Sequence, residues 1–263
     1  MRGLRRSRRS ATDPRRVSTD LILLIAGAAT AGFVQGVSGF GFSMVALSFW
    51  VWGFEPRTAA VMAVFGALSG QVLSAFTVRR ALSVSTLLPF LAGGAVGIPL
   101  GVWALPHLDP AVFRLTVGVI LLVCCPAMLL ASRFPTVQHG GRSADAIVGA
   151  VGGVMGGLGG FSGVAPSLWC TLRGYDKDLQ RSVIQNFNLA ALSVTMATYI
   201  ATGAVSAAML PQFAIVLPAL VIPSLIGARV YVGLSPLAFR RVVLSLLTMV
   251  GVAMVAAALP AMR

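Results

Sequence analysis

Two glycine-rich stretches are the places in this chain where residue types and spacing best suit binding chemistry. Their candidate binding residues are Gln35, Ser38, Gly39, Gly41 and Ser43, and then Gly159, Gly160, Ser162 and Gly163. Glycine adopts positive φ without steric cost, so unwound backbone can approach a ligand closely. A helix that begins after such a break presents unpaired N–H groups and the positive end of its dipole. The pattern therefore predicts a binding site for a small anion, with serine hydroxyls as further donors.

The two stretches repeat one another. The pattern Gly-x-x-Gly-Phe occurs at 36–40 and again at 157–161, an offset of 121 residues. Downstream, Ser48-Phe49-Trp50 is matched by Ser167-Leu168-Trp169. A duplicated, glycine-broken apolar unit is how many membrane transporters build a binding site near the middle of the bilayer. The same glycines can also serve close helix packing in lipid, but their recurrence in both halves favours a site.

A second group of candidates is the sequence Gln185-Asn186-Phe187-Asn188. Three amides within four residues are costly in an apolar stretch unless they are paired. We predict that Asn186 and Asn188 contact the substrate, although hydrogen bonds that hold the unwound backbone would explain them equally well. The corresponding first-half positions, 64–67, carry no amide, so the two halves are chemically unequal.

Composition places the chain in a bilayer. Charged residues make up 10% and hydrophobic residues 57% of the sequence, whereas soluble domains carry about 25% charge. The net charge is +13, but seven of the twenty basic residues fall in the first sixteen positions and most others lie between apolar runs. This distribution is typical of a membrane protein oriented by its loops rather than of a nucleic-acid-binding protein. We expect a multi-pass protein of the cell membrane whose partners are lipid and a small anion.

The chain divides into segments of membrane-spanning length, for which about 20 apolar residues suffice. We predict an all-α polytopic protein of two homologous halves. The predicted regions are a basic tail (1–19), a first repeat (20–131), a polar linker (132–143) and a second repeat (144–263). The predicted apolar segments are 21–53, 57–78, 82–105, 111–131, 145–172, 181–202, 212–232 and 237–259.

The first segment of each half is too long and too rich in glycine for one regular helix. Backbone that leaves the helix at membrane depth is tolerated only where protein or a wet cavity satisfies it. Three arrangements are open: both broken segments cross, both return to their starting side, or only the second returns. We predict about eight transmembrane segments, with at least one first segment broken or re-entrant.

Enzyme chemistry has no support in the sequence. Acidic side chains and histidines fall at segment ends or in loops, which leaves no carboxylate pair for acid–base work. The three cysteines, Cys124, Cys125 and Cys170, lie in apolar stretches without metal-ligand spacing. We predict no enzyme activity, no metal site and no cofactor.

The motifs resemble those of the TauE/SafE family, the sulfite exporter group of membrane permeases. The resemblance covers residues 21–260, and its most specific part is the second-half stretch 152–166 with Asn186 downstream. Two features depart from the family pattern. Phe42 and Phe161-Ser162 interrupt the usual run of glycines, and Val45 stands where the second half has Pro166.

Membership implies a plasma-membrane permease for small organic or inorganic anions, often sulfur-containing ones such as sulfite or a sulfonate. This agrees with the anion site predicted from the residues themselves. We expect a secondary transporter that binds the anion between the two broken segments. The alternatives are a channel-like anion pore and a membrane scaffold or assembly protein that transports nothing.

Overall fold

The computed structural model describes residues 14–77, 83–133, 135–137, 139–230 and 236–260, and these residues form helices and no strand. The helices of the first half are α2 (Pro14–Ser38), α3 (Phe42–Trp50), α4 (Pro56–Thr77), α5 (Val84–Ala104) and α6 (Pro110–Leu130). Those of the second half are α7 (Gly141–Gly159), α8 (Val164–Leu172), α9 (Lys177–Ala201), α10 (Leu210–Val230) and α11 (Pro236–Ala258). Three 3₁₀ turns join them, at Leu105–His107, Ala131–Arg133 and Ala207–Met209. The all-helical prediction is therefore confirmed for the described residues.

The predicted segment boundaries lie close to the observed ones, but the predicted number of spans is not confirmed. Six candidate spans among the described residues are long and apolar enough to cross a bilayer: 18–38, 56–76, 84–107, 110–130, 207–229 and 241–258. α7 and α9, with 19 and 25 residues, are not among the six. Most of the predicted basic tail, residues 1–13, lies outside the described residues, and α2 begins at Pro14.

Each half begins with a long helix that is followed by a short helix running back along it. At the end of α3, the Nε1–H of Trp50 donates to the carbonyl oxygen of Leu23, in the first half of α2 (3.1 Å). In the second half, the Nε1–H of Trp169 on α8 donates to Oδ1 of Asp145 on α7 (2.7 Å). The short helix of each hairpin therefore ends beside an earlier part of the long one, at Leu23 in α2 and at Asp145 in α7.

Two arginines gather helix ends of both halves at one end of the molecule. The Nε–H of Arg57, at the start of α4, donates to the carbonyl oxygen of Ala204, just after α9 (2.9 Å). An Nη2–H of Arg114, at the start of α6, donates to the carbonyl oxygen of Val51, just after α3 (3.3 Å). The starts of α4 and α6 and the ends of α3 and α9 therefore share one level.

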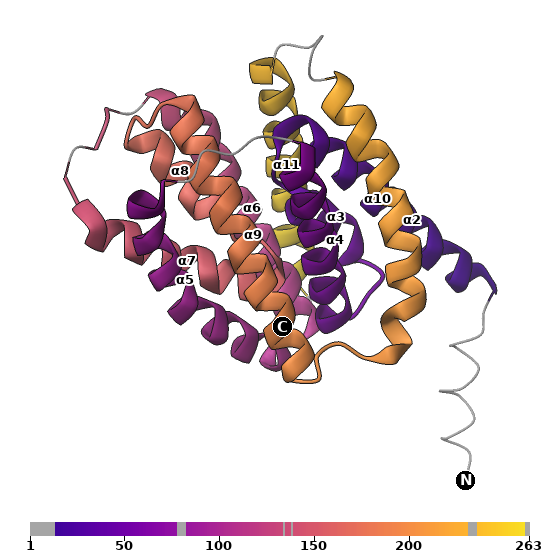
Figure 1. Cartoon of the computed structure of the whole chain (residues 1–263). Coiled ribbons are helices and arrows are strands. Elements are labelled where there is room, and N and C mark those ends of the chain that lie inside the picture. Colours follow the sequence, from indigo (N-terminus) through magenta and orange to yellow (C-terminus); the bar gives the residue numbers. More distant parts are fainter. Residues whose placement is uncertain (1–13, 78–82, 134, 138, 231–235, 261–263) are drawn as a thin grey trace.

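Helices of one half pack mainly against helices of the other half. α5 of the first half packs along α7, α10 of the second half packs along α2, and α6 packs against α11 (Figure 1). Glycines permit the close approach: a Cβ on Gly97 of α5 would overlap the carbonyl oxygen of Ala150 on α7. In the same way, a Cβ on Gly36 of α2 would overlap the carbonyl oxygen of Ser224 on α10. Small residues at helix crossings are the usual means of tight association in lipid.

Candidate functional site

Two short non-helical stretches form the turns of the two hairpins. The first runs from Ser38 to Phe42 and contains Gly39 (φ 77°) and Gly41 (φ 95°), and the second follows α7 and contains Gly160 (φ 81°). These φ values lie in the left-handed region, which costs a residue with a side chain about 1–2 kcal/mol. The three glycines are therefore required by the backbone conformation of the turns.

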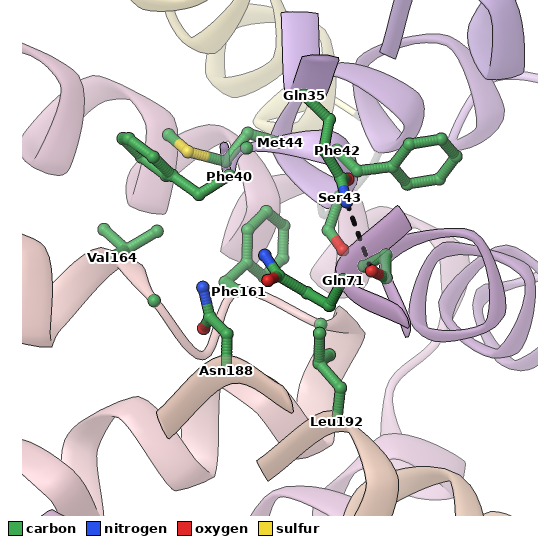
Figure 2. A pocket seen from close by; sticks show the side chains of 14 residues that line it. Gln35, Phe40, Phe42, Ser43, Met44, Gln71, Phe161, Val164, Asn188 and Leu192 are labelled. Atoms are coloured by element: carbon green, nitrogen blue, oxygen red, sulfur yellow. Dashed lines mark hydrogen bonds between the residues drawn. The ribbon is translucent and has the colours of Figure 1, made fainter. Parts of the chain in front are cut away.

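The two turns meet at one cavity with about 310 Å³ of atom-free space, including the part that opens outward. Figure 2 shows the labelled side chains around it, among them Asn188 of α9, Gln71 of α4 and Ser43 of α3. The lining residues are Gln35, Phe40, Gly41, Phe42, Ser43, Met44, Ala67, Gln71, Gly160, Phe161, Gly163, Val164, Asn188 and Leu192. Both halves of the chain thus contribute to the same cavity.

The cavity wall follows the sequence repeat. Phe40 and Phe161 both line it and are 121 positions apart, the offset of the glycine motifs. The same offset relates Ala67 to Asn188 and Gln71 to Leu192, and all four line the cavity. Each half therefore places one amide on the helix after its hairpin, one turn further along in the first half than in the second.

Asn188 is held so that its amide N–H groups face the cavity. The hydroxyl of Ser162 donates to Oδ1 of Asn188 (2.8 Å), and Asn188 is only 4% exposed. This bond directs Oδ1 toward the second turn, which leaves Nδ2 on the cavity side, as Figure 2 shows. Gly163 makes room for the amide, because a Cβ there would overlap Nδ2. A buried N–H pair directed into a cavity is a suitable donor set for an anion.

Both short helices begin at the cavity. The first three residues of α3, Phe42, Ser43 and Met44, line it, and so does Val164, the first residue of α8. The first N–H groups of a helix have no acceptor within the helix, and its dipole places partial positive charge there. At the start of α8, the N–H of Val164 already donates to the carbonyl oxygen of Phe161 (3.1 Å). The start of α3 therefore offers the larger set of backbone donors.

Two glutamines attach the first hairpin to α4. The Nε2–H of Gln71 donates to the carbonyl oxygen of Gly39 (3.0 Å), and Nε2–H of Gln35 donates to that of Ala67 (3.4 Å). Oε1 of Gln35 is buried and has no hydrogen-bond partner within the described residues. The cavity wall thus offers an acceptor oxygen as well as amide donors, which suits a ligand carrying a proton or a bound water.

The structure brings six of the predicted site residues to the cavity: Gln35, Gly41, Ser43, Gly160, Gly163 and Asn188. The other five are Ser38, Gly39, Gly159, Ser162 and Asn186, which do not line it. Ser162 does not line the cavity but donates a hydrogen bond to Asn188, which does. The carbonyl oxygen of Gly39 likewise accepts a hydrogen bond from Gln71, which lines the cavity. Asn186 lies on another side of α9, where its Nδ2–H donates to the hydroxyl of Ser182 (3.4 Å).

Sequence reasoning missed Gln71 and the aromatic part of the wall. Positions 64–67, which correspond to Gln185–Asn188 in the repeat, carry no amide, and the structure places the first-half amide one turn later, at Gln71. The signal that would have found Gln71 is its place four residues after Ala67, on the same face of a helix. Phe40 and Phe161 belong to the repeated motif itself, and their matching positions in the repeat are the sequence feature that points to them.

The two hairpins touch at Gly160. A Cβ added there would overlap the hydroxyl oxygen of Ser43 from the other hairpin, and the left-handed φ adds backbone strain. We expect Gly160→Ala to lower the apparent Tm of the purified protein by about 5 °C, since roughly 1–2 kcal/mol of strain corresponds to a few degrees in a chain of this size.

Ser43 provides the control for this prediction, because its hydroxyl oxygen is the atom that the added Cβ would overlap. Adding Ser43→Ala should recover part of the lost Tm, because it removes the overlapping oxygen and leaves the φ strain. Ser43→Ala alone should change the Tm little. Equal Tm values for Gly160→Ala with and without Ser43→Ala would show that the hairpins do not meet at this point.

The sequence of the chain matches a known protein family. A family model described as Sulfite exporter TauE/SafE matches residues 23–254, which include both hairpin turns and every residue that lines the cavity. No curated protein sequence and no solved structure matches the chain significantly. The match spans nearly the whole sequence and agrees with the apolar helices and the repeated glycine motifs. The chain belongs to the sulfite exporter TauE/SafE family of membrane transporters.

Proposed function

We propose that this protein is a secondary transporter for a small anion, inorganic or organic and sulfur-containing, that binds in the cavity between the two hairpin turns. The observation that carries the proposal is the convergence of donors on one cavity. The amide of Asn188, fixed by Ser162, faces the same space as the N–H groups at the start of α3. A planar or pyramidal oxyanion would accept hydrogen bonds from both sides.

The depth of the cavity supports transport rather than surface binding. Ala67 and Asn188 each follow the first residue of their helix by eleven positions, which is about 16 Å along the helix axis. An anion beside them would lie near the middle of a bilayer whose core is about 30 Å thick. Inverted repeats that meet at such a depth are the usual basis of alternating access.

We propose further that the two hairpins are re-entrant and that the two halves are inverted in the membrane. Three helices then cross in each half, α4–α6 and α9–α11, and the two hairpins return to opposite sides. This set includes α9, which is outside the six candidate spans, and leaves out α2, which is one of them. The N–H of Val137, before α7, donates to the carbonyl oxygen of Leu172 at the end of α8 (2.8 Å). This contact supports placing the two ends of the second hairpin on one side.

Cysteine labelling tests this topology. In a protein whose native Cys124, Cys125 and Cys170 are replaced by alanine, single cysteines at Thr136 and Asp178 should react with an impermeant maleimide from the same side of the membrane. A cysteine at Ser206, in the loop after α9, should react from the opposite side. The side chains of Thr136, Asp178 and Ser206 are all exposed in the structure. Labelling of Thr136→Cys and Asp178→Cys from opposite sides would contradict re-entrance of the second hairpin.

Uptake into proteoliposomes tests the transport proposal. We expect saturable uptake of at least one of radiolabelled sulfite, thiosulfate, sulfate and methanesulfonate. We also expect counterflow: preloading with the unlabelled anion should drive transient accumulation of the labelled one. Saturable flux without counterflow would favour a channel-like pore, and no flux of any of these anions under imposed proton, sodium and potassium gradients would refute the proposal.

A further inference from the structure

A second cavity lies beside the anion cavity and is almost wholly apolar. It has about 330 Å³ of atom-free space, including the part that opens outward, and lies between the first hairpin and α11. Phe40, Gly41 and Met44 line both cavities, so a single layer of residues separates them. We infer that this apolar cavity holds the hydrocarbon part of an organic anion whose charged group occupies the anion cavity. The inference rests on the proposed function and deepens it, because it selects alkyl-substituted anions as a substrate class.

The lining of the second cavity excludes a polar occupant. Its one polar side chain is Ser38, whose hydroxyl lies 2.7 Å from the carbonyl oxygen of Val34 and 2.5 Å from that of Phe40. The hydroxyl is thus engaged by the backbone of the turn. The far wall is formed by Leu244 and Leu247, with Val243 beside them on α11. Water in such a space would find no polar partners, whereas methylene groups would gain from leaving water.

The position of the second cavity favours a substrate tail over a membrane lipid. Leu244 is 4% and Leu247 is 6% exposed, and Met44 on the opposite wall is 2% exposed. These three side chains are covered by protein, Val243 beside them is half-buried, and Val242, which faces outward, is 58% exposed. A chain that enters the apolar cavity from the anion site needs only to pass Phe40 and Met44, which already form the common wall.

One aromatic side chain of the first turn lies between the two cavities. Phe40, Phe42 and Phe161 all line the polar cavity, and of these three only Phe40 also lines the apolar one. The Phe40 side chain therefore lies between the two cavities. A tail directed past Phe40 would be separated from the amides of α4 and α9, so charged and apolar parts of the ligand would each meet matching surroundings.

The test uses competition by a series of alkylsulfonates in proteoliposomes of the full chain. Radiolabelled sulfite and radiolabelled methanesulfonate are the probes, and unlabelled methane-, ethane-, propane- and butanesulfonate are the competitors. If the tail enters the apolar cavity, the inhibition constant should fall about fourfold for each added methylene until the cavity is full, the gain expected for burial of one CH₂.

Variants of α11 assign this effect to the cavity. Val243→Phe fills the space and should abolish the dependence on chain length, so that butanesulfonate inhibits no better than methanesulfonate. Val242→Phe makes the same change on the exposed face of the same helix and should keep the full dependence. Leu247→Ala enlarges the cavity and should shift the preferred chain by one or two methylenes, a gain that misfolding cannot produce.

The possible outcomes separate this inference from the proposed function. Absence of uptake of both probes would overturn the transport proposal and the inference with it. Uptake that all sulfonates inhibit equally, or a length dependence that Val243→Phe and Leu247→Ala leave unchanged, would overturn the inference alone. A flat series together with phospholipid that copurifies with the protein and is lost in Val243→Phe would assign the cavity to a lipid chain instead.

Discussion

Asn188→Leu is expected to reduce the kcat/KM of anion uptake about 100-fold without a large loss of folded protein. The amide N–H groups of Asn188 face the cavity, and leucine has a similar volume but no donor. Hydrogen bonds to a charged group contribute about 1.5–3 kcal/mol each, and about 1.4 kcal/mol corresponds to a factor of ten. The measurement is initial uptake into proteoliposomes over a range of anion concentrations.

A neighbouring amide provides the matched control. Asn186→Leu makes the same change two residues away on α9, where the amide is bonded to Ser182 and does not line the cavity. It should keep kcat/KM within about threefold, a value that corresponds to loss of a single modest hydrogen bond. Equal losses in the two variants would mean that α9 needs its amides for structure and that Asn188 has no special contact with the anion.

Two further variants, at Asn188 and at its partner Ser162, separate the effect of charge at the amide from the effect of its orientation. Asn188→Asp keeps the side-chain shape and can still accept from Ser162, but it replaces the donors with negative oxygen, so uptake should fall as far as in Asn188→Leu. Ser162→Ala keeps the donors and frees the amide to rotate, so the loss should be intermediate, about tenfold, mostly in KM. Full activity of Asn188→Asp would show that no anion approaches this side chain.

Gly97→Val is expected to lower the apparent Tm by roughly 10 °C and to reduce the yield of folded protein. Gly97 lies where α5 crosses α7, and a Cβ there would overlap the carbonyl oxygen of Ala150 and approach the N atom of Val154 to 2.9 Å. Both atoms belong to backbone, so only separation of the two helices relieves the contact. Overpacking of this kind costs about 1–3 kcal/mol or more, and each kcal/mol shifts Tm by about 2–4 °C.

The control for Gly97→Val lies on the same helix. Ala95 is exposed on the outer surface of α5, so Ala95→Val introduces a β-branched residue without a contact at the crossing. It should leave Tm within about 2 °C, because helix propensity alone changes stability by only a few tenths of a kcal/mol. Thermal unfolding in detergent compares the two proteins. Similar Tm values would contradict the close crossing of α5 and α7.

Much of the architecture could be predicted from the sequence because each helix of the repeat is marked by local chemistry. Apolar runs bounded by charges and turn residues place seven of the eight longer segments within four residues of their observed ends, whereas the first, predicted from residue 21, begins at Pro14. The glycine motifs marked the places where helix stops, since left-handed φ at Gly39, Gly41 and Gly160 is a local property of the backbone. The family resemblance, carried by the same motifs, is confirmed by the family match.

The fold-back of the short helices could not be predicted from local patterns. Nothing in the spacing of residues 42–50 distinguishes a helix that continues across the bilayer from one that returns. The return is fixed by contacts between distant residues, such as that of Trp50 with the carbonyl oxygen of Leu23. The role of Gln71 does not follow from the repeat for a related reason: the position that matches Asn188 is Ala67, whereas the first-half amide reaches the cavity from one turn further along α4.

The most direct measurement is the location of a bound anion in the structure of the protein itself. Selenite has the charge and shape of sulfite, and its selenium atom gives an anomalous X-ray signal. We expect a single anomalous peak in crystals grown with selenite, placed where its oxygens accept from Nδ2 of Asn188 and from N–H groups at the start of α3. The peak should be absent from Asn188→Leu crystals. Selenite that competes for uptake and yet binds outside the cavity between the two hairpin turns would contradict the account.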